Sequence, residues 1–297
     1  MRPGSLTRLL VVAAALARSS DAFAPPPMAA SRAAVSSPRS SSLHVRNPFA
    51  GRAPVPEAVP EEMVPVPGPL DAKNYAAAAV WAVLVGWAFL LAPGALGSSA
   101  DNDMIQLLVS QPVPRPEGVN ELWFGVWNCF AVVPTVIAAL EAPVGRGQRL
   151  PATPFLWGSV AFGFFALGPY FATRTVRDEP AAPGDLGFAS RNIFENKAFA
   201  AALAALAVSI PFTSDLIGCD FPAVLAGFAD LASGSRFVAV ASADIAIMSV
   251  LAAVLVSEDA RRRGWEDKSL PLLAAMTLLP VVGPSLYLLV RPSLEEA

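Results

Sequence analysis

Six long runs of apolar residues, separated by polar segments, occupy the chain from about residue 74 onward. They cover about 74–98, 119–141, 153–174, 196–214, 237–257 and 269–291. At 1.5 Å per residue, each run is long enough to cross the ~30 Å hydrocarbon core of a membrane as an α-helix. The pattern predicts an all-α polytopic membrane bundle of about six transmembrane helices, with a short tail at 292–297. Residues 219–232 are apolar but too short to span, and are expected at the interface or as a re-entrant segment.

The loops between these runs predict pairing and orientation. The short loop Val144–Leu150 indicates that the second and third spans form an antiparallel hairpin. Basic residues favour the loops after spans one, three and five, so these loops are expected on one side of the membrane and both termini on the other. The similarity of Leu122-Trp123-Phe-Gly…Pro134 to Leu156-Trp157-Gly…Pro169 suggests that these two spans are duplicated.

The loop before the last span is strongly basic. It contains Arg261, Arg262 and Arg263, followed by Trp265. Such a run is typical of a topology anchor with an interfacial indole, and it could also bind anionic lipid.

Polar residues inside the second span recur at heptad spacing. Glu121, Asn128 and Thr135 fall along one helix stripe. A carboxylate or an amide in hydrocarbon costs several kcal/mol unless its hydrogen bonds are satisfied, so this stripe is expected to face the bundle interior or a cavity. Two interpretations stay open: a binding or conducting role, or an interfacial acid with an amide that bonds a neighbouring helix.

Two further polar residues are candidates for function. Tyr170 lies with Ser159 and Gly163 on one face of the third span, where it is either an interfacial tyrosine or part of a binding surface. Asp244 lies about two turns inside the fifth span and is the most deeply placed acid. An intramembrane aspartate is a functional-site hypothesis by default, so Asp244 is the strongest single-residue candidate.

Composition excludes several classes of function. Of the 297 residues, 54% are hydrophobic and 15% are charged, which is typical of a membrane protein. Beyond residue 56 the chain holds 14 Lys and Arg against 23 Asp and Glu, which disfavours nucleic-acid binding. The single histidine, His44, precedes the predicted bundle, so the usual imidazole-dependent catalytic, metal and haem sites are not expected. The sequence leans against an enzyme and predicts no metal or cofactor, although a bound pigment or lipid is possible.

The first 73 residues differ in character from the bundle. Residues 1–22 have two arginines before an apolar run and small residues at its end, as in a signal peptide. Residues 23–56 lack acids and are rich in Ser and Arg, as in a transit peptide, and residues 57–73 form a Pro-rich leader expected to be disordered. This order resembles the bipartite plastid presequence of algae with secondary plastids, which implies a thylakoid or inner-envelope location.

Two family resemblances concern the bundle. Leu122–Arg174, with Asn128…Pro134 and Gly168-Pro-Tyr-Phe…Arg174, resembles uncharacterised multi-pass membrane proteins shared by cyanobacteria and chloroplasts. The ending Gly283-Pro-Ser-Leu-Tyr-Leu-Leu-Val-Arg291 is similar to that of the chloroplast membrane family required for neoxanthin synthesis, but the chain lacks the Gly-Arg-Trp pattern of the preceding helix in that family.

Three functions are compatible with these observations. A non-catalytic scaffold or assembly factor for other plastid membrane proteins is favoured by the missing catalytic residues and short loops. A transporter of a small solute or ion would use Glu121, Asn128 and Asp244. A carotenoid- or lipid-modifying factor is implied by the second resemblance. In each case the expected partners are membrane lipids and, for the scaffold, other membrane proteins.

Overall fold

The computed structural model describes residues 68–177, 186–265, 279–292 and 294. These residues form helices joined by turns and contain no β-strand, which confirms the predicted all-α class. The signal-peptide and transit-peptide segments, and the leader as far as residue 67, lie outside the described residues.

Four helices have the length and apolar composition needed to cross a membrane. They are α2 (Ala72–Leu90), α4 (Glu121–Glu141, extended by the 3-10 turn Ala142–Val144), α5 (Ala152–Phe171) and α8 (Arg236–Arg262). Shorter helices are α3 (Ser99–Ser110), α6 (Lys197–Thr213), α7 (Phe221–Gly234) and α10 (Val282–Val290), with a π-helical turn at Ser190–Phe194. Six full spans are therefore not confirmed, and the four long helices support only the coarser prediction of a membrane protein.

The predicted third span does not run straight. Within α5, Gly163 has φ 54° and ψ −135°, which breaks the helix into two limbs, 152–162 and 164–171. The rings of Phe155 and Tyr170 stack with their centroids 6.0 Å apart. In a straight helix 15 residues would separate them by roughly 22 Å. α5 is therefore a re-entrant hairpin that begins and ends at the same end of the bundle.

Small residues and one proline explain how this hairpin packs. A Cβ added to Gly158 would lie 3.2 Å from Ala166 Cβ, so the two limbs are in close contact. Pro169 has no N–H, which leaves the carbonyl of Phe165 without its intrahelical donor. The indole Nε1 of Trp81 on α2 donates to this carbonyl at 3.0 Å. The proline thereby creates the acceptor that ties the hairpin to α2.

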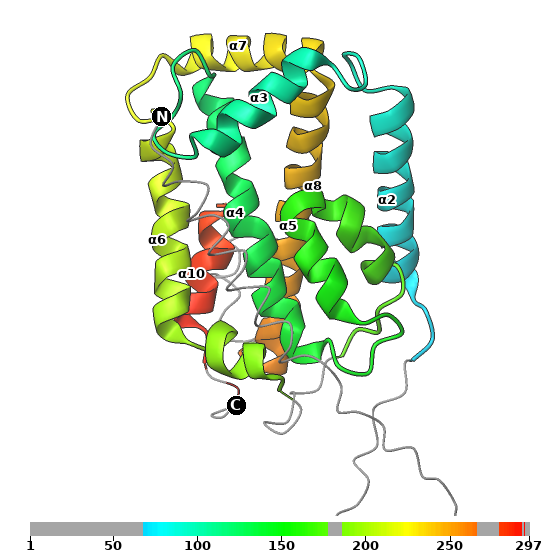
Figure 1. Ribbon diagram of the computed structural model, residues 1–297. Helices are drawn as coiled ribbons and strands as arrows, with labels where there is room; N and C mark the ends of the chain where they lie inside the picture. Colours follow the sequence, from blue (N-terminus) through cyan, green and yellow to red (C-terminus); the bar gives the residue numbers. More distant parts are fainter. Residues whose placement is uncertain (1–67, 178–185, 266–278, 293, 295–297) are drawn as a thin grey trace, which may run out of the picture.

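The order of elements indicates two parallel repeats. α2, α3, α4 and α5 are followed by α6, α7, α8 and a final segment that ends in α10. α3 and α7 lie across the same end of the bundle, and α4 and α8 descend side by side from that end (Figure 1). α2 packs on α5 as α6 packs on α10, and α4 packs on α8. We interpret the described parts of the two halves as parallel repeats, which several transporter folds also have.

The sequence carries a matching signature in both repeats. Each has a Gly-Pro pair followed by a tyrosine and, four residues later, an arginine. The residues are Gly168, Pro169, Tyr170 and Arg174 in the first repeat, and Gly283, Pro284, Tyr287 and Arg291 in the second. In both repeats the tyrosine hydroxyl donates to an acid near the end of the preceding long helix, Glu141 or Asp259. This duplication differs from the one expected from sequence, because residues 156–169 lie in the hairpin and are not equivalent to α4.

The re-entrant hairpin also changes the distribution of charge. Of the 13 Lys and Arg residues in the described part of the chain, 11 lie at the end of the bundle where α4 and α8 finish, which we call the basic end. Only Arg115 and Arg236 lie at the opposite end, near α3 and α7. This places the loop after α2 opposite the segment after α5, contrary to the orientation expected from six straight spans. The positive-inside rule predicts that such an end faces the non-translocated side of a membrane.

Candidate functional site

A carboxylate from α8 holds the tip of the α5 hairpin. Asp244 Oδ1 accepts a hydrogen bond from the backbone N–H of Phe164 at 2.7 Å. Phe164 is the first residue of the second limb, so its N–H is one of the donors that a helix N-terminus leaves without an intrahelical partner. Gly163 permits this close approach, because a Cβ there would overlap the Asp244 carboxylate. Asp244 on α8, which the sequence singled out, therefore lies beside the break in the apolar helix α5.

Asp244 is buried, and no basic side chain among the described residues pairs with it. The residue is 3% exposed and lies roughly 12 Å along α8 from its first residue. None of the ion pairs among the described residues includes it. An isolated buried carboxylate is costly, so the amide donor and the positive end of the limb 164–171 are what stabilise its charge. The alternative for such a group is to take up a proton.

A second set of buried charges lies at the basic end, and we call it the Arg174 network. Arg174 Nη1 contacts Glu141 Oε2 at 3.0 Å, and its Nη2 contacts Glu258 Oε2 at 2.7 Å. Tyr170 donates its hydroxyl to Glu141 at 2.8 Å, and Lys73 Nζ lies 3.0 Å from Glu258 Oε1. The Glu141 and Glu258 side chains are fully buried. Arg174 therefore joins the ends of α4 and α8, one from each repeat.

The equivalent set in the second repeat is the Arg291 network. Asp259 Oδ2 accepts from Arg263 Nε at 2.7 Å, from Arg291 Nη1 at 3.1 Å and from the Tyr287 hydroxyl at 2.9 Å. Glu195, just before α6, bonds both Arg263 and Arg291. Unlike Arg174, Arg291 shares its carboxylates with a second arginine.

One arginine in each network has a pKa above its usual value. Burial alone would lower the pKa of the Arg174 guanidinium, but Glu141 and Glu258 outweigh this effect and raise the pKa above its usual value. For Arg263, burial again acts to lower the pKa, and Asp259 and Glu195 raise it well above the ordinary value. The two guanidinium groups therefore stay charged, and their ion pairs join the helix ends at the basic end.

The heptad stripe on α4 does not form one site. Glu121 pairs with Arg115 at 3.0 Å near the end of the bundle. Asn128 and Thr135 donate to carbonyls of their own helix, those of Phe124 and Ala131. Each of the three groups is thus satisfied locally, and the stripe supplies no shared partner.

The basic residues that follow α8 differ in exposure. Arg261 is exposed, but Arg262 and Arg263 are 2% and 3% exposed. Arg263 belongs to the Arg291 network, and Arg262 Nη2 donates to the carbonyl of Leu140. Trp265 is half-buried with its ring centroid 6.2 Å from that of Tyr287. Of the three arginines only Arg261 is exposed, because buried carboxylates and a carbonyl bind the next two inside the protein.

Known proteins give no guide to this arrangement. No protein-family model, curated protein or solved structure matches the chain. The described residues also contain no group of three or more His, Cys, Asp or Glu side chains that could hold a metal ion. The function has to be argued from Asp244, the hairpin and the two repeats.

Proposed function

We propose that this chain is an ion transporter that moves protons across the membrane, with Asp244 as the proton-binding group. One observation carries the proposal: a buried carboxylate without a basic partner bonds the tip of a re-entrant helix. Protonation of Asp244 would weaken its bond to the Phe164 N–H, because an ionised acceptor makes the stronger hydrogen bond. Proton occupancy and the position of the hairpin tip are thereby linked, which is what a transport cycle requires.

The architecture supports the same function. Parallel repeats and broken helices with a polar group at the break are recurrent features of transporters. A scaffold or assembly factor, which the sequence favoured, does not require a buried carboxylate inside the bilayer, where burial of its charge is energetically unfavourable. The order of the hypotheses therefore changes, and transport comes before scaffolding.

Reconstitution in liposomes tests the proposal through substitutions that separate charge from shape. In Asp244→Asn the amide oxygen can still accept from the Phe164 N–H, but the side chain can no longer carry a proton. With a potassium diffusion potential as driving force, we expect proton uptake, read by an internal pH dye, to fall at least about tenfold in this variant. Glu121→Gln is the matched control, because it removes an acid that pairs with Arg115 at the end of the bundle, and it should leave uptake unchanged.

Two results would overturn the proposal. If liposomes that contain the wild-type protein acidify no faster than empty liposomes, the protein does not transport protons. Equal uptake by wild type and Asp244→Asn would show that protons move by another route.

We also propose that the membrane is a plastid membrane, on the grounds of the signal-peptide-like residues 1–22 and the acid-free residues 23–56. A C-terminal fluorescent fusion should coincide with plastid autofluorescence. A signal confined to the plasma membrane or the endoplasmic reticulum would contradict this location.

A further inference from the structure

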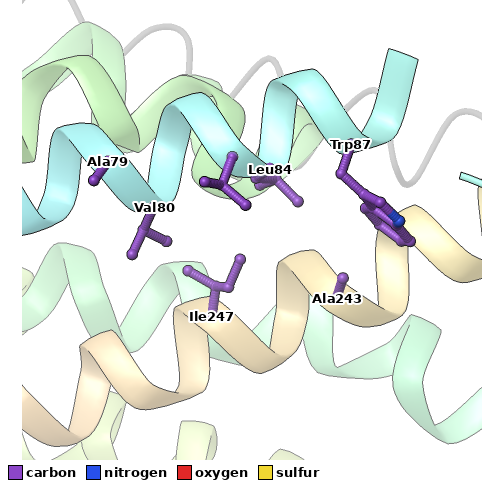
Figure 2. A pocket seen from close by; sticks show the side chains of 7 residues that line it. Ala79, Val80, Leu84, Trp87, Ala243 and Ile247 are labelled. Atoms are coloured by element: carbon purple, nitrogen blue, oxygen red, sulfur yellow. The ribbon is translucent and has the colours of Figure 1, made fainter. Parts of the chain in front are cut away.

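A groove runs along the outside of the bundle between α2 and α8. Towards the basic end it has a volume of about 550 Å³, and residues of the second limb of α5 and the segment after it line its back. It continues towards the other end as a smaller cavity of about 360 Å³. Val80 and Ile247 line both parts, so the two form one continuous surface. Figure 2 shows the smaller part, where Val80, Leu84 and Trp87 of α2 face Ala243 and Ile247 of α8.

The groove is apolar along its length and charged at one end only. Its smaller part exposes no polar surface, and the side walls of the larger part are Ala, Val, Ile, Leu and Phe side chains. At the basic end it is closed by Lys73, Asn74, Arg174 and Glu258. A ligand that fits has a hydrocarbon tail and one polar end.

The length of the groove matches a membrane lipid tail. From Lys73 to Trp87 along α2, and from Glu258 to Ala243 along α8, the helical rise gives roughly 21 and 22 Å. A lipid tail spans one leaflet, which is half of the ~30 Å hydrocarbon core and therefore shorter than the groove. A whole tail thus fits between the charged end and Trp87. Because the groove lies between one pair of helices, it favours a ligand with one hydrocarbon tail over a ligand with two.

The charges at the mouth select the head group. Lys73, Arg174 and Glu258 line the mouth, and Glu141 lies behind Arg174; the four charges pair with one another, so this network carries no net charge. An anionic head would lie next to Glu258, and a cationic head next to Lys73, and like charges at such distances are unfavourable. Lys73 is half-exposed and uses one of its three N–H donors on Glu258. The remaining donors suit neutral oxygen acceptors.

We propose that this groove binds a single-chain amphiphile with an uncharged head group rich in hydroxyl or ester oxygens, head at Lys73 and tail end at Trp87. Asp244 itself does not line the groove, although its partner Phe164 does, and a protein that moves no protons would still bind the ligand.

Three probes with the same oleyl-type chain test the head group: monoolein, oleic acid and oleylamine. With the purified protein in nanodiscs, we expect monoolein to bind at least about tenfold more tightly than the other two, measured by native mass spectrometry. A monoacylglycerol brominated near the end of its tail should also quench tryptophan fluorescence, and Trp87→Phe should remove most of that quenching.

Matched variants locate the site. Ala246 lines the groove and is exposed, so Ala246→Trp should fill it and abolish monoolein binding without unfolding the protein. Ala202→Trp, at an exposed position on α6, should leave binding unchanged. Equal binding of all three probes, or unchanged binding by Ala246→Trp, would overturn the proposal and leave the groove as ordinary lipid-covered surface. If the wild-type protein binds monoolein but takes up no protons, the result would contradict the transport function and leave the lipid-binding proposal standing.

Discussion

Replacing Arg174 with methionine should lower the free energy of unfolding by about 3–5 kcal/mol, because two buried carboxylates would lose their shared partner. Arg174 contacts both Glu141 and Glu258, and neither carboxylate side chain has measurable exposure. Lys73 would remain near Glu258, but Glu141 would keep only the Tyr170 hydroxyl among its partners in the described part of the chain. The measurement is denaturant unfolding in mixed micelles, followed by tryptophan fluorescence.

Two further variants show whether the loss comes from uncompensated charge. Arg291→Met should cost less, about 1–2 kcal/mol, because Asp259 and Glu195 both keep Arg263. The triple variant Arg174→Met, Glu141→Gln and Glu258→Gln should recover much of the stability, since a neutral network leaves no unpaired charge. Equal losses for Arg174→Met and Arg291→Met would show that the two networks do not differ as the geometry indicates.

The apolar pattern was sufficient to predict helices but not their paths. Runs at 119–141 and 237–257 appear as α4 and α8 with similar bounds. The run at 153–174 has the same length and apolarity as a straight span, and the residue that turns it back is Gly163. A glycine in an apolar helix is common in membrane proteins, so sequence alone did not separate a packing glycine from a hairpin tip.

The buried networks were missed for a related reason. Acids and arginines at the ends of apolar runs, such as Glu141, Arg174 and Glu258, have the pattern of ordinary interfacial charges. Their burial depends on the hairpin, which returns Arg174 to the end of α4 from which α5 started. The repeated Gly-Pro, tyrosine and arginine signature was the one sequence signal available, and it is spaced about 117 residues apart.

The sequence singled out Asp244 by its depth in an apolar run, but it did not predict the partner of Asp244. The sequence placed it about two turns inside a span, in agreement with its 3% exposure. Its contact with Phe164 joins residues 80 positions apart and depends on the packing of the hairpin against α8. A residue's depth follows from its position in an apolar run, whereas its partner follows from the tertiary fold.

Gly163→Ala should be the most damaging small substitution in the hairpin, with an expected loss of roughly 2–5 kcal/mol in the free energy of unfolding. Gly163 has a positive φ of 54° with ψ −135°, a conformation that side chains with a Cβ rarely adopt. The added methyl would also overlap the Asp244 carboxylate. The tip must therefore move away from α8, and the Phe164 N–H would lose its acceptor. Proton uptake should fall together with stability, because the same contact serves both.

Gly86→Ala is the matched control for this substitution. Gly86 lies within α2, and a Cβ there would meet nothing within 4 Å. Because alanine is the better helix former, this variant should be unchanged or more stable by up to about 1 kcal/mol. Both variants add one methyl group to a glycine in an apolar helix, so any difference between them reports the backbone conformation and the carboxylate at the tip. If Gly163→Ala unfolds at the same denaturant concentration as Gly86→Ala, residue 163 is not a strained hairpin tip, and α5 has to be reconsidered as a straight span.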